Sequence, residues 1–250
     1  MIPTSVFPIT HREMPYIITD QELRTLFAEC DREPFCKQSP CRHLIIPVIF
    51  RLIYCCGLRP NEGRELKRAD FNEAEGTLFI RKNKSHRERL LPLSDDVAVM
   101  CRNYLSDSRK VYPDTEYMFP SPDGDSYNRK WLSETFRRLW NASNPGSKAK
   151  KIRVYLLRHR FATAVFMKWL DEKSDIYAKM PYLSTYMGHT QFEDTAYRVK
   201  HVELSYVFYV IQISTLDTRI VHLVHECIGS DIFDGLKQLY SSNRKSISNI

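Results

Sequence analysis

The sequence predicts a mainly helical fold with one small antiparallel β-sheet, an α+β class. Most periodic segments space their apolar residues as on one face of a helix, and one pair of short segments has strand composition on either side of a turn. The chain has 250 residues, of which 43% are hydrophobic, so it can bury a core as one large domain with appendages. The sequence contains no internal repeat.

The first helix is expected to begin at the capping box Thr19-Asp-Gln-Glu22, in which two side chains satisfy backbone N–H groups that the helix leaves unpaired. Its apolar face carries Leu23, Leu26 and Phe27. Residues 42–56 are apolar enough for a second, buried helix.

Gly57 is expected to end that buried helix. A short helix then starts at Arg59-Pro60-Asn61-Glu62, because proline is well tolerated in the first turn. This places an arginine at the junction between two helices.

Two segments, Thr77–Arg81 and Arg89–Leu93, are expected to pair as strands around a turn at Asn83–Arg87. Basic side chains crowd the tip of this predicted hairpin: Arg81, Lys82, Lys84, Arg87 and Arg89. Further along the chain, four more helices are expected, over Asp95–Leu105, Trp131–Trp140, Leu157–Leu170 and Tyr182–Met187.

The composition favours a polyanionic partner. Lysine and arginine outnumber aspartate and glutamate by 37 to 30, which gives a net charge of +7 and an isoelectric point near 9.0. Residues 1–15 contain no continuous apolar run, and no stretch of about 18 apolar residues could span a membrane. We therefore expect a cytoplasmic protein without a membrane segment.

The seven cysteines lack the CxxC spacing of zinc sites, so they are expected to be reduced thiols, with a zinc site as the alternative. No cofactor and no metal site are expected.

Six reactive residues follow one another along the chain, each in a context that suits chemistry on a phosphodiester: Arg59, Lys84, Tyr155, Arg158, His189 and Tyr197. Two arginines, a lysine and a histidine can gather around one phosphate and stabilise the extra negative charge of its transition state. A tyrosine hydroxyl can attack the phosphorus and hold the strand covalently. Cations supplied by side chains make a metal unnecessary for such a reaction.

The local contexts support these assignments. Arg59 can aim its planar guanidinium at a phosphate while Glu62 orients it. Tyr155 and Arg158 lie three positions apart and share a helix face. Taken singly, each of these residues is more often a solvated or structural side chain, so the prediction depends on the set.

In this order and context the residues resemble the tyrosine recombinase (phage integrase) family. The matching stretches are YCCGLRPNEGREL, KSHRERLLPL, VYLLRHRFATA and YLSTYMGHTQFEDTAY, which fall within residues 17–197. The resemblance implies a tyrosine-recombinase-like catalytic domain whose basic hairpin, with Arg81, Lys82, Arg87 and Arg89, contacts DNA.

The resemblance also implies a role for each residue of the site. Arg59 and Arg158 would clamp the scissile phosphate, Lys84 would protonate the leaving 5′ oxygen, and His189 would bind a nonbridging oxygen. Tyr155 stands where the family usually has a histidine and where tyrosine or lysine also occurs. It would still orient the phosphate, but a phenol is a weaker general base near neutral pH because its reference pKa is about 10.

Tyr197 would be the nucleophile that forms a 3′-phosphotyrosyl link without ATP or metal. The family's tyrosine normally lies nine residues after the histidine, whereas Tyr197 lies eight after His189 and position 198 is an arginine. One residue turns a helix by about 100°, so this offset can point the hydroxyl away from the phosphate. Tyr206 and Tyr209 are the alternative nucleophiles.

The expected division of the chain is a linker remnant at 1–16, an integrase-type catalytic domain at 17–200 and a divergent C-terminal tail at 201–250. Family members usually carry an N-terminal helical domain that grips the other side of the DNA. Only 16 residues precede the match, so DNA affinity is expected to be low, because phosphate contacts dominate binding.

The leading hypothesis is a site-specific recombinase or integrase that breaks and rejoins double-stranded DNA, acting as four protomers on two sites. A catalytically inactive, DNA-binding remnant of a mobile-element integrase is the alternative, and Arg198 at the expected tyrosine position favours it. A relative of type IB topoisomerases is a third hypothesis, against which the short chain and the integrase-like GHTQFEDTAY segment argue.

Overall fold

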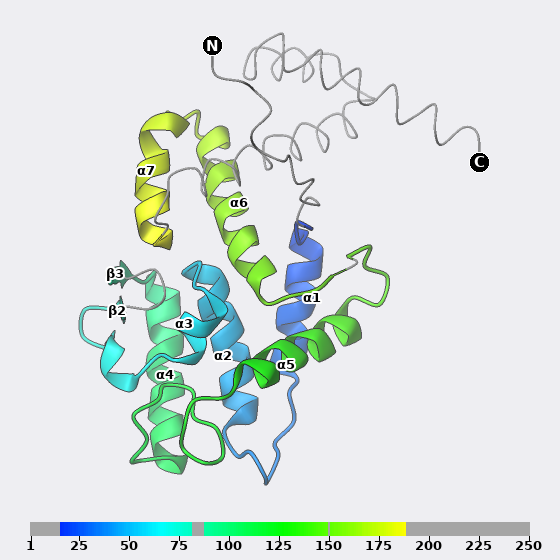
Figure 1. Ribbon diagram of the computed structural model, residues 1–250, viewed down its shortest axis with the longest axis vertical. Helices are drawn as coiled ribbons and strands as arrows, with labels where there is room; N and C mark the ends of the chain where they lie inside the picture. The colour runs from blue at the N-terminus through cyan, green and yellow to red at the C-terminus, as the bar shows by residue number, and fades with distance from the viewer. Residues whose placement is uncertain (1–15, 82–87, 150, 189–250) are drawn as a thin grey trace, which may run out of the picture. The chain divides into compact units, whose positions relative to one another are not determined.

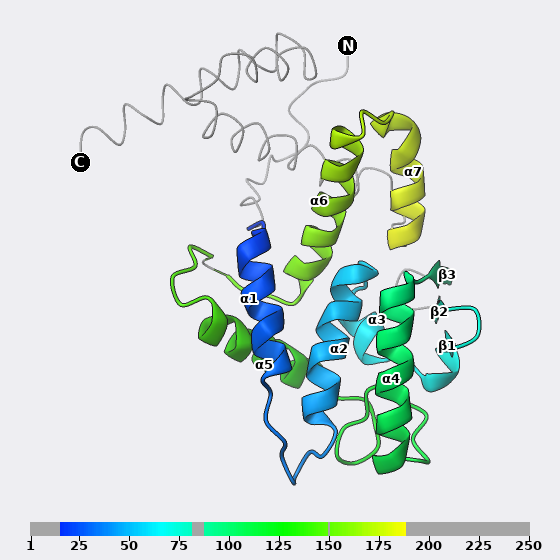
Figure 2. The same ribbon diagram turned by 180° about the vertical axis from the view of Figure 1, so that it is seen from behind.

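A computed structural model of the chain describes residues 16–81, 88–149 and 151–188. Within these ranges the fold has seven α-helices, a short 3-10 helix and a three-stranded antiparallel sheet. The predicted class, mainly helical with one small sheet, is confirmed. Figure 1 and the reverse view in Figure 2 both show helix α2 between α1 and α4.

Helix α1, Asp20–Asp31, starts at the predicted capping box. The Glu22 N–H donates to Thr19 Oγ1 at 3.2 Å, and the Thr19 N–H donates to Glu22 Oε2 at 3.0 Å. Leu23 and Leu26 are buried on its inner face, so this helix is anchored by both its cap and its apolar stripe.

Helix α2, Arg42–Cys55, forms the centre of the core. Its inner positions, Ile45, Ile49 and Ile53, are fully buried, and it packs against α1, α4 and α6. Gly57 follows with a φ of +57°, and an added Cβ would lie 2.5 Å from the Phe161 ring. The chain can therefore reverse here only with glycine.

Helix α3, Pro60–Arg64, and the 3-10 helix Arg68–Asp70 lead into the sheet of β1, Phe71–Asn72, β2, Thr77–Ile80, and β3, Arg89–Pro92. The strand order is β1-β2-β3, and all neighbours are antiparallel. Leu78 pairs with Leu91 and Ile80 with Arg89, so these residues line the same, inner face of the sheet.

Strand β1 was not expected, because two residues carry no readable alternation. The predicted turn at Asn83–Arg87 lies outside the described ranges, whereas the two strands that it was expected to join are described.

Helices α4, Asp95–Val111, and α5, Arg129–Ser143, follow, and α6, Tyr155–Asp171, lies side by side with α7, Ile176–Met187, in both views (Figures 1 and 2). All four extend beyond their predicted bounds. The start of α7 moves most: Asp175 caps it by accepting from the Ala178 N–H at 3.0 Å, and the helix runs through Pro181.

Burial keeps the thiols of the core protonated. It raises the pKa of Cys30 and of Cys101 to about 12. The six cysteines in the described ranges form no disulfide with one another. None of the helices described is both long and apolar enough to cross a membrane.

Candidate active site

Arg59 stands at the junction of α2 and α3, where Glu62 holds it from two sides. Its Nη1 donates to Glu62 Oε1 at 2.8 Å, and its backbone N–H donates to Glu62 Oε2 at 2.8 Å. The Glu62 side chain is 1% exposed and that of Arg59 is 25% exposed. Glu62 therefore fixes the base of the arginine while leaving part of its guanidinium accessible, as the sequence context suggested.

Arg89, on β3, approaches the same carboxylate. Its Nη2 lies 2.7 Å from Glu62 Oε2 and its Nη1 3.0 Å from Oε1, a bidentate pair, while its Nε donates to the Tyr186 carbonyl at 2.9 Å. Arg89 is expected from the sequence at the hairpin tip as a DNA contact, but its side chain is only 8% exposed and is directed inward. The reason is the strand period: Arg89 shares its face with the buried Leu91.

The two arginines keep Glu62 ionised. Burial alone would raise the pKa of this carboxyl, but the hydrogen bonds and charge of Arg89, followed by the hydrogen bonds of Arg59, outweigh burial and lower the pKa to about 2. The carboxylate thus accepts four hydrogen bonds from two arginines.

Arg158 comes to the same place from α6. It is fully buried, and it donates from Nη1 to the Gly57 carbonyl at 2.5 Å and from Nη2 to the Met187 carbonyl at 2.6 Å. One turn earlier lies the half-buried Tyr155, whose ring packs edge to face on that of His159 with the ring centroids 5.0 Å apart. The predicted shared face of positions 155 and 158 is present at the start of α6.

The last turn of α7 is where the three arginines converge. The carbonyls of Tyr186, Met187 and Gly188 accept from Arg89, Arg158 and Arg59 respectively, the last at 2.6 Å. These are carbonyls that a helix end leaves without intrahelical partners, and they carry the negative end of the helix dipole.

We refer to Arg59, Glu62, Arg89 and Arg158 as the arginine cluster. Arg59 and Arg89 share the Glu62 carboxylate, and Arg158 joins them at the end of α7. With three guanidinium groups and one carboxylate, the cluster is positively charged and suits a phosphate diester.

The remaining predicted residues lie partly outside the described ranges. Lys84, His189 and Tyr197 are among these, as are the hairpin residues Lys82 and Arg87, so their roles stay predictions. Arg81 is described: it is 51% exposed and pairs with the buried Asp70 at 2.6 Å.

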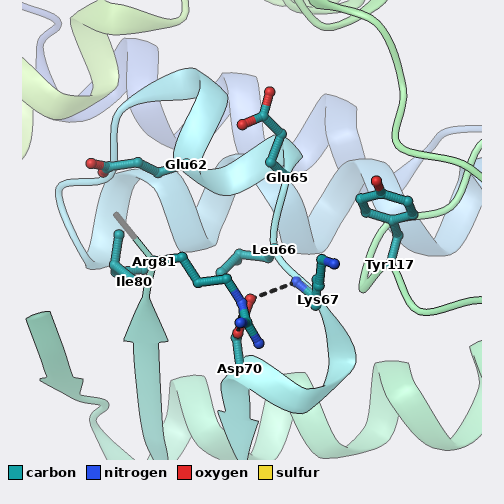
Figure 3. Close-up of a pocket in the computed structure, with 8 residues that line it drawn as sticks. All are labelled: Glu62, Glu65, Leu66, Lys67, Asp70, Ile80, Arg81 and Tyr117. Carbon is teal, nitrogen blue, oxygen red and sulfur yellow. Dashed lines mark hydrogen bonds and ion pairs between the residues drawn. The ribbon is translucent and has the colours of Figure 1, made fainter. Parts of the chain in front are cut away.

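A pocket of about 260 Å³ opens next to the cluster (Figure 3). Glu62, Glu65 and Asp70 line it together with Lys67 and Arg81. Carboxylates outnumber cations on its walls, so the pocket is a poor phosphate site and the arginine cluster is the better one. In the described part of the chain no group of three or more histidine, cysteine, aspartate or glutamate side chains could hold a metal ion.

Sequence reasoning missed the structural role of Arg89 and the meeting point on α7. The alternation of β3 is a signal that could have found the first, because positions 89 and 91 must share a face. The three carbonyls carry no sequence signal, since any residue supplies one.

Comparison with known proteins agrees with this picture. A sequence model of the phage integrase family matches residues 17–200. The protein y4rE of Sinorhizobium fredii, which carries the name integrase/recombinase, is 29% identical over 185 residues, covering 73% of this chain and 59% of the relative. The tyrosine recombinase XerC of Oceanobacillus iheyensis is 24% identical over 173 residues, covering 67% of this chain and 53% of XerC. The chain thus spans between half and two thirds of the length of these two relatives.

Solved structures share the fold. The XerH site-specific recombinase bound to its palindromic difH substrate aligns with a TM-score of 0.60 and 21% identity, over 76% of this chain and 50% of that one. The catalytic domain of bacteriophage HP1 integrase aligns with a TM-score of 0.51 and 19% identity, over 82% of this chain and 98% of that one. The predicted tyrosine-recombinase-like catalytic fold is therefore confirmed.

Proposed function

The chain belongs to the phage integrase family, and from this premise we propose that it is a site-specific DNA recombinase or integrase that breaks and rejoins double-stranded DNA through a 3′-phosphotyrosine. The observation that carries the proposal is the convergence of Arg59 and Arg158 on the end of α7, immediately before His189. The DNA-bound XerH complex supports duplex DNA as the partner.

In the proposed reaction the Tyr197 hydroxyl attacks the scissile phosphorus, forming a phosphotyrosyl bond as the bond to the 5′ oxygen breaks. Lys84 gives its proton to that leaving oxygen. Arg59, Arg158 and His189 bind the nonbridging oxygens and stabilise the added negative charge. Attack by the 5′ hydroxyl of another strand reverses the step, so the exchange conserves bond energy and uses no ATP.

Arg158 is less accessible in the described structure than the proposed clamp requires. Arg158 is fully buried and donates to two main-chain carbonyls, so a phosphate can reach its guanidinium only when the end of α7 moves. Arg59 is partly exposed and can meet the phosphate first. We propose that phosphate oxygens of the DNA replace the Met187 and Gly188 carbonyls as acceptors for Arg158 and Arg59.

Adduct trapping tests the proposal. A nicked duplex built from the ends of the element that carries the gene releases the short strand beyond the cut, so a covalent complex accumulates and runs as a slower band on a denaturing gel. We expect the band with the natural chain and not with Tyr197→Phe. A band that persists in Tyr197→Phe would show that another residue is the nucleophile, and Tyr206 and Tyr209 would be tested next.

The second candidate is a DNA-binding remnant without catalysis, which Arg198 at the family's usual tyrosine position favours. Such a remnant would bind the same duplex, more weakly as the salt concentration rises. It would form no adduct, although all of its tyrosines are present. For either candidate we place the protein in the cytoplasm; for the recombinase we propose four protomers assembled on two DNA sites.

A further inference from the structure

Arg89 is the member of the arginine cluster that no step of the proposed reaction uses. It is almost fully buried, on the inner face of β3, and all of its guanidinium nitrogens donate to a named acceptor: two to Glu62 and one to the Tyr186 carbonyl. A buried arginine with a bidentate carboxylate partner is costly to desolvate, so its contacts need an explanation beyond stability.

We propose that Arg89 is a positioning residue: it neutralises Glu62 so that Arg59 keeps its positive charge for the phosphate, and it fixes the end of α7 on which Arg59 and Arg158 converge. The inference rests on the proposed function and extends it to a residue that does not touch the DNA.

Glu62, whose side chain is 1% exposed, sets the charge of the group around Arg59. With Arg59 alone it would form a pair without net charge. The second guanidinium, at 2.7 and 3.0 Å, leaves the group of three positive. Water and salt screen such short, buried contacts little, so this difference is felt by a phosphate that approaches Arg59.

Arg89 also contacts the turn at Tyr186–Gly188. Arg89 holds its first carbonyl, and Arg158 and Arg59 hold the next two. Gly188 has a φ of +65°, and an added Cβ would lie 2.8 Å from Arg89 Nη1, so the arginine packs directly on this backbone. Arg89 thus ties the sheet to the helix end that precedes His189.

The test compares four proteins: the natural chain, Arg89→Met, the double variant Glu62→Gln/Arg89→Met, and Arg109→Met as the matched control. Arg109 makes an ion pair with Glu73 at the surface, and its side chain is 46% exposed. It therefore controls for the loss of an arginine that is not buried. The double variant also removes the buried Glu62 carboxylate, which Arg89→Met would leave with Arg59 but without its bidentate Arg89 partner. A loss of folding in the single variant can therefore be recognised.

We expect Arg89→Met to slow adduct formation at saturating nicked duplex by about 100-fold, while the Kd for that duplex changes less than about threefold. The double variant regains about tenfold of the rate, because the Glu62 carboxylate no longer cancels the positive charge of Arg59. A purely structural role predicts no recovery of rate in the double variant. A single variant within about threefold of Arg109→Met, or a double variant no faster than the single, overturns the inference.

A second measurement separates this inference from the proposed function. Inorganic phosphate that binds the folded cluster raises the unfolding temperature. We expect that rise in the natural chain, in Arg109→Met and in the double variant, and its loss in Arg89→Met. If the natural chain forms no adduct but shows this pattern, the proposed function fails, while the role of Arg89 in holding the cluster ready for a phosphate is supported. No rise in the natural chain, or an equal rise in Arg89→Met, overturns the inference.

Discussion

Arg59, at the N-cap of α3, and Arg158, on α6, donate to adjacent main-chain carbonyls at the end of α7, those of Gly188 and Met187, each at 2.6 Å. Two residues predicted to clamp one phosphate are thus brought together in the free protein by a helix terminus. The carbonyl oxygens carry partial negative charge, so they occupy guanidinium donors that phosphate oxygens would otherwise use.

Arg158→Met should destabilise the fold strongly. The side chain is fully buried, and its loss leaves the carbonyls of Gly57 and Met187 without their arginine donor. We expect the free energy of unfolding to fall by about 2–5 kcal/mol in urea titrations. The surface control Arg109→Met should change it by less than about 0.5 kcal/mol. Equal values for the two variants would show that these carbonyls do not depend on Arg158.

Gly188→Ala should cost more stability than Gly124→Ala. Both glycines have positive φ, +65° and +86°, so both variants bear backbone strain. At Gly124 an added Cβ meets nothing within 4 Å, whereas at Gly188 it meets Arg89 Nη1 at 2.8 Å. The difference in unfolding free energy between the two variants should be about 1–3 kcal/mol. Gly146→Ala, in open space with ordinary φ, calibrates the measurement.

Acid should weaken the arginine cluster. The pKa of Glu62 is lowered from 4.5 to about 2 in the folded chain, so its contribution to stability is fully present above pH 4.5 and is lost as pH falls toward 2. Across that window the unfolding free energy should fall by up to about 3 kcal/mol more in the natural chain than in Glu62→Gln. Parallel pH profiles for the two proteins would contradict the assignment.

Tyr155→His should make adduct formation faster near neutral pH. An imidazole is the better base there, and position 155 lies one turn before Arg158, on the same face of α6. We expect the rate advantage of the variant to be largest near pH 7 and to shrink as the pH rises. The profile of initial rate against pH, taken for both proteins on the same nicked duplex, checks this. An unchanged profile would show that Tyr155 takes no part in the proton transfers of adduct formation.

Features that depend on a few neighbouring residues could be predicted from the sequence. The Thr19 capping box, the Gly57 stop and the spacing of Tyr155 and Arg158 each depend on a few neighbouring residues, and the structure contains all three features. The start of α7 was misjudged because Pro181 usually marks a helix boundary, whereas here the helix runs through it from an Asp175 cap.

Tertiary contacts were harder to foresee. The direction of Arg89 followed from strand alternation, but its partner Glu62 lies on another element, and a cluster of basic residues in sequence suggested a solvated tip instead. The meeting of three arginines on backbone carbonyls depends on how α3, β3, α6 and α7 pack, which no local pattern encodes.

The most direct test of the central claim is to identify the residue that carries DNA. Adducts trapped on the nicked duplex would be digested with nuclease and protease, and the peptide bearing the residual nucleotide would be sequenced by mass spectrometry. We expect a 3′-phosphonucleotide on Tyr197, in a peptide that is unmodified in Tyr197→Phe. Duplex binding with no nucleotide-bearing peptide would contradict it and leave a protein that binds DNA without cutting it.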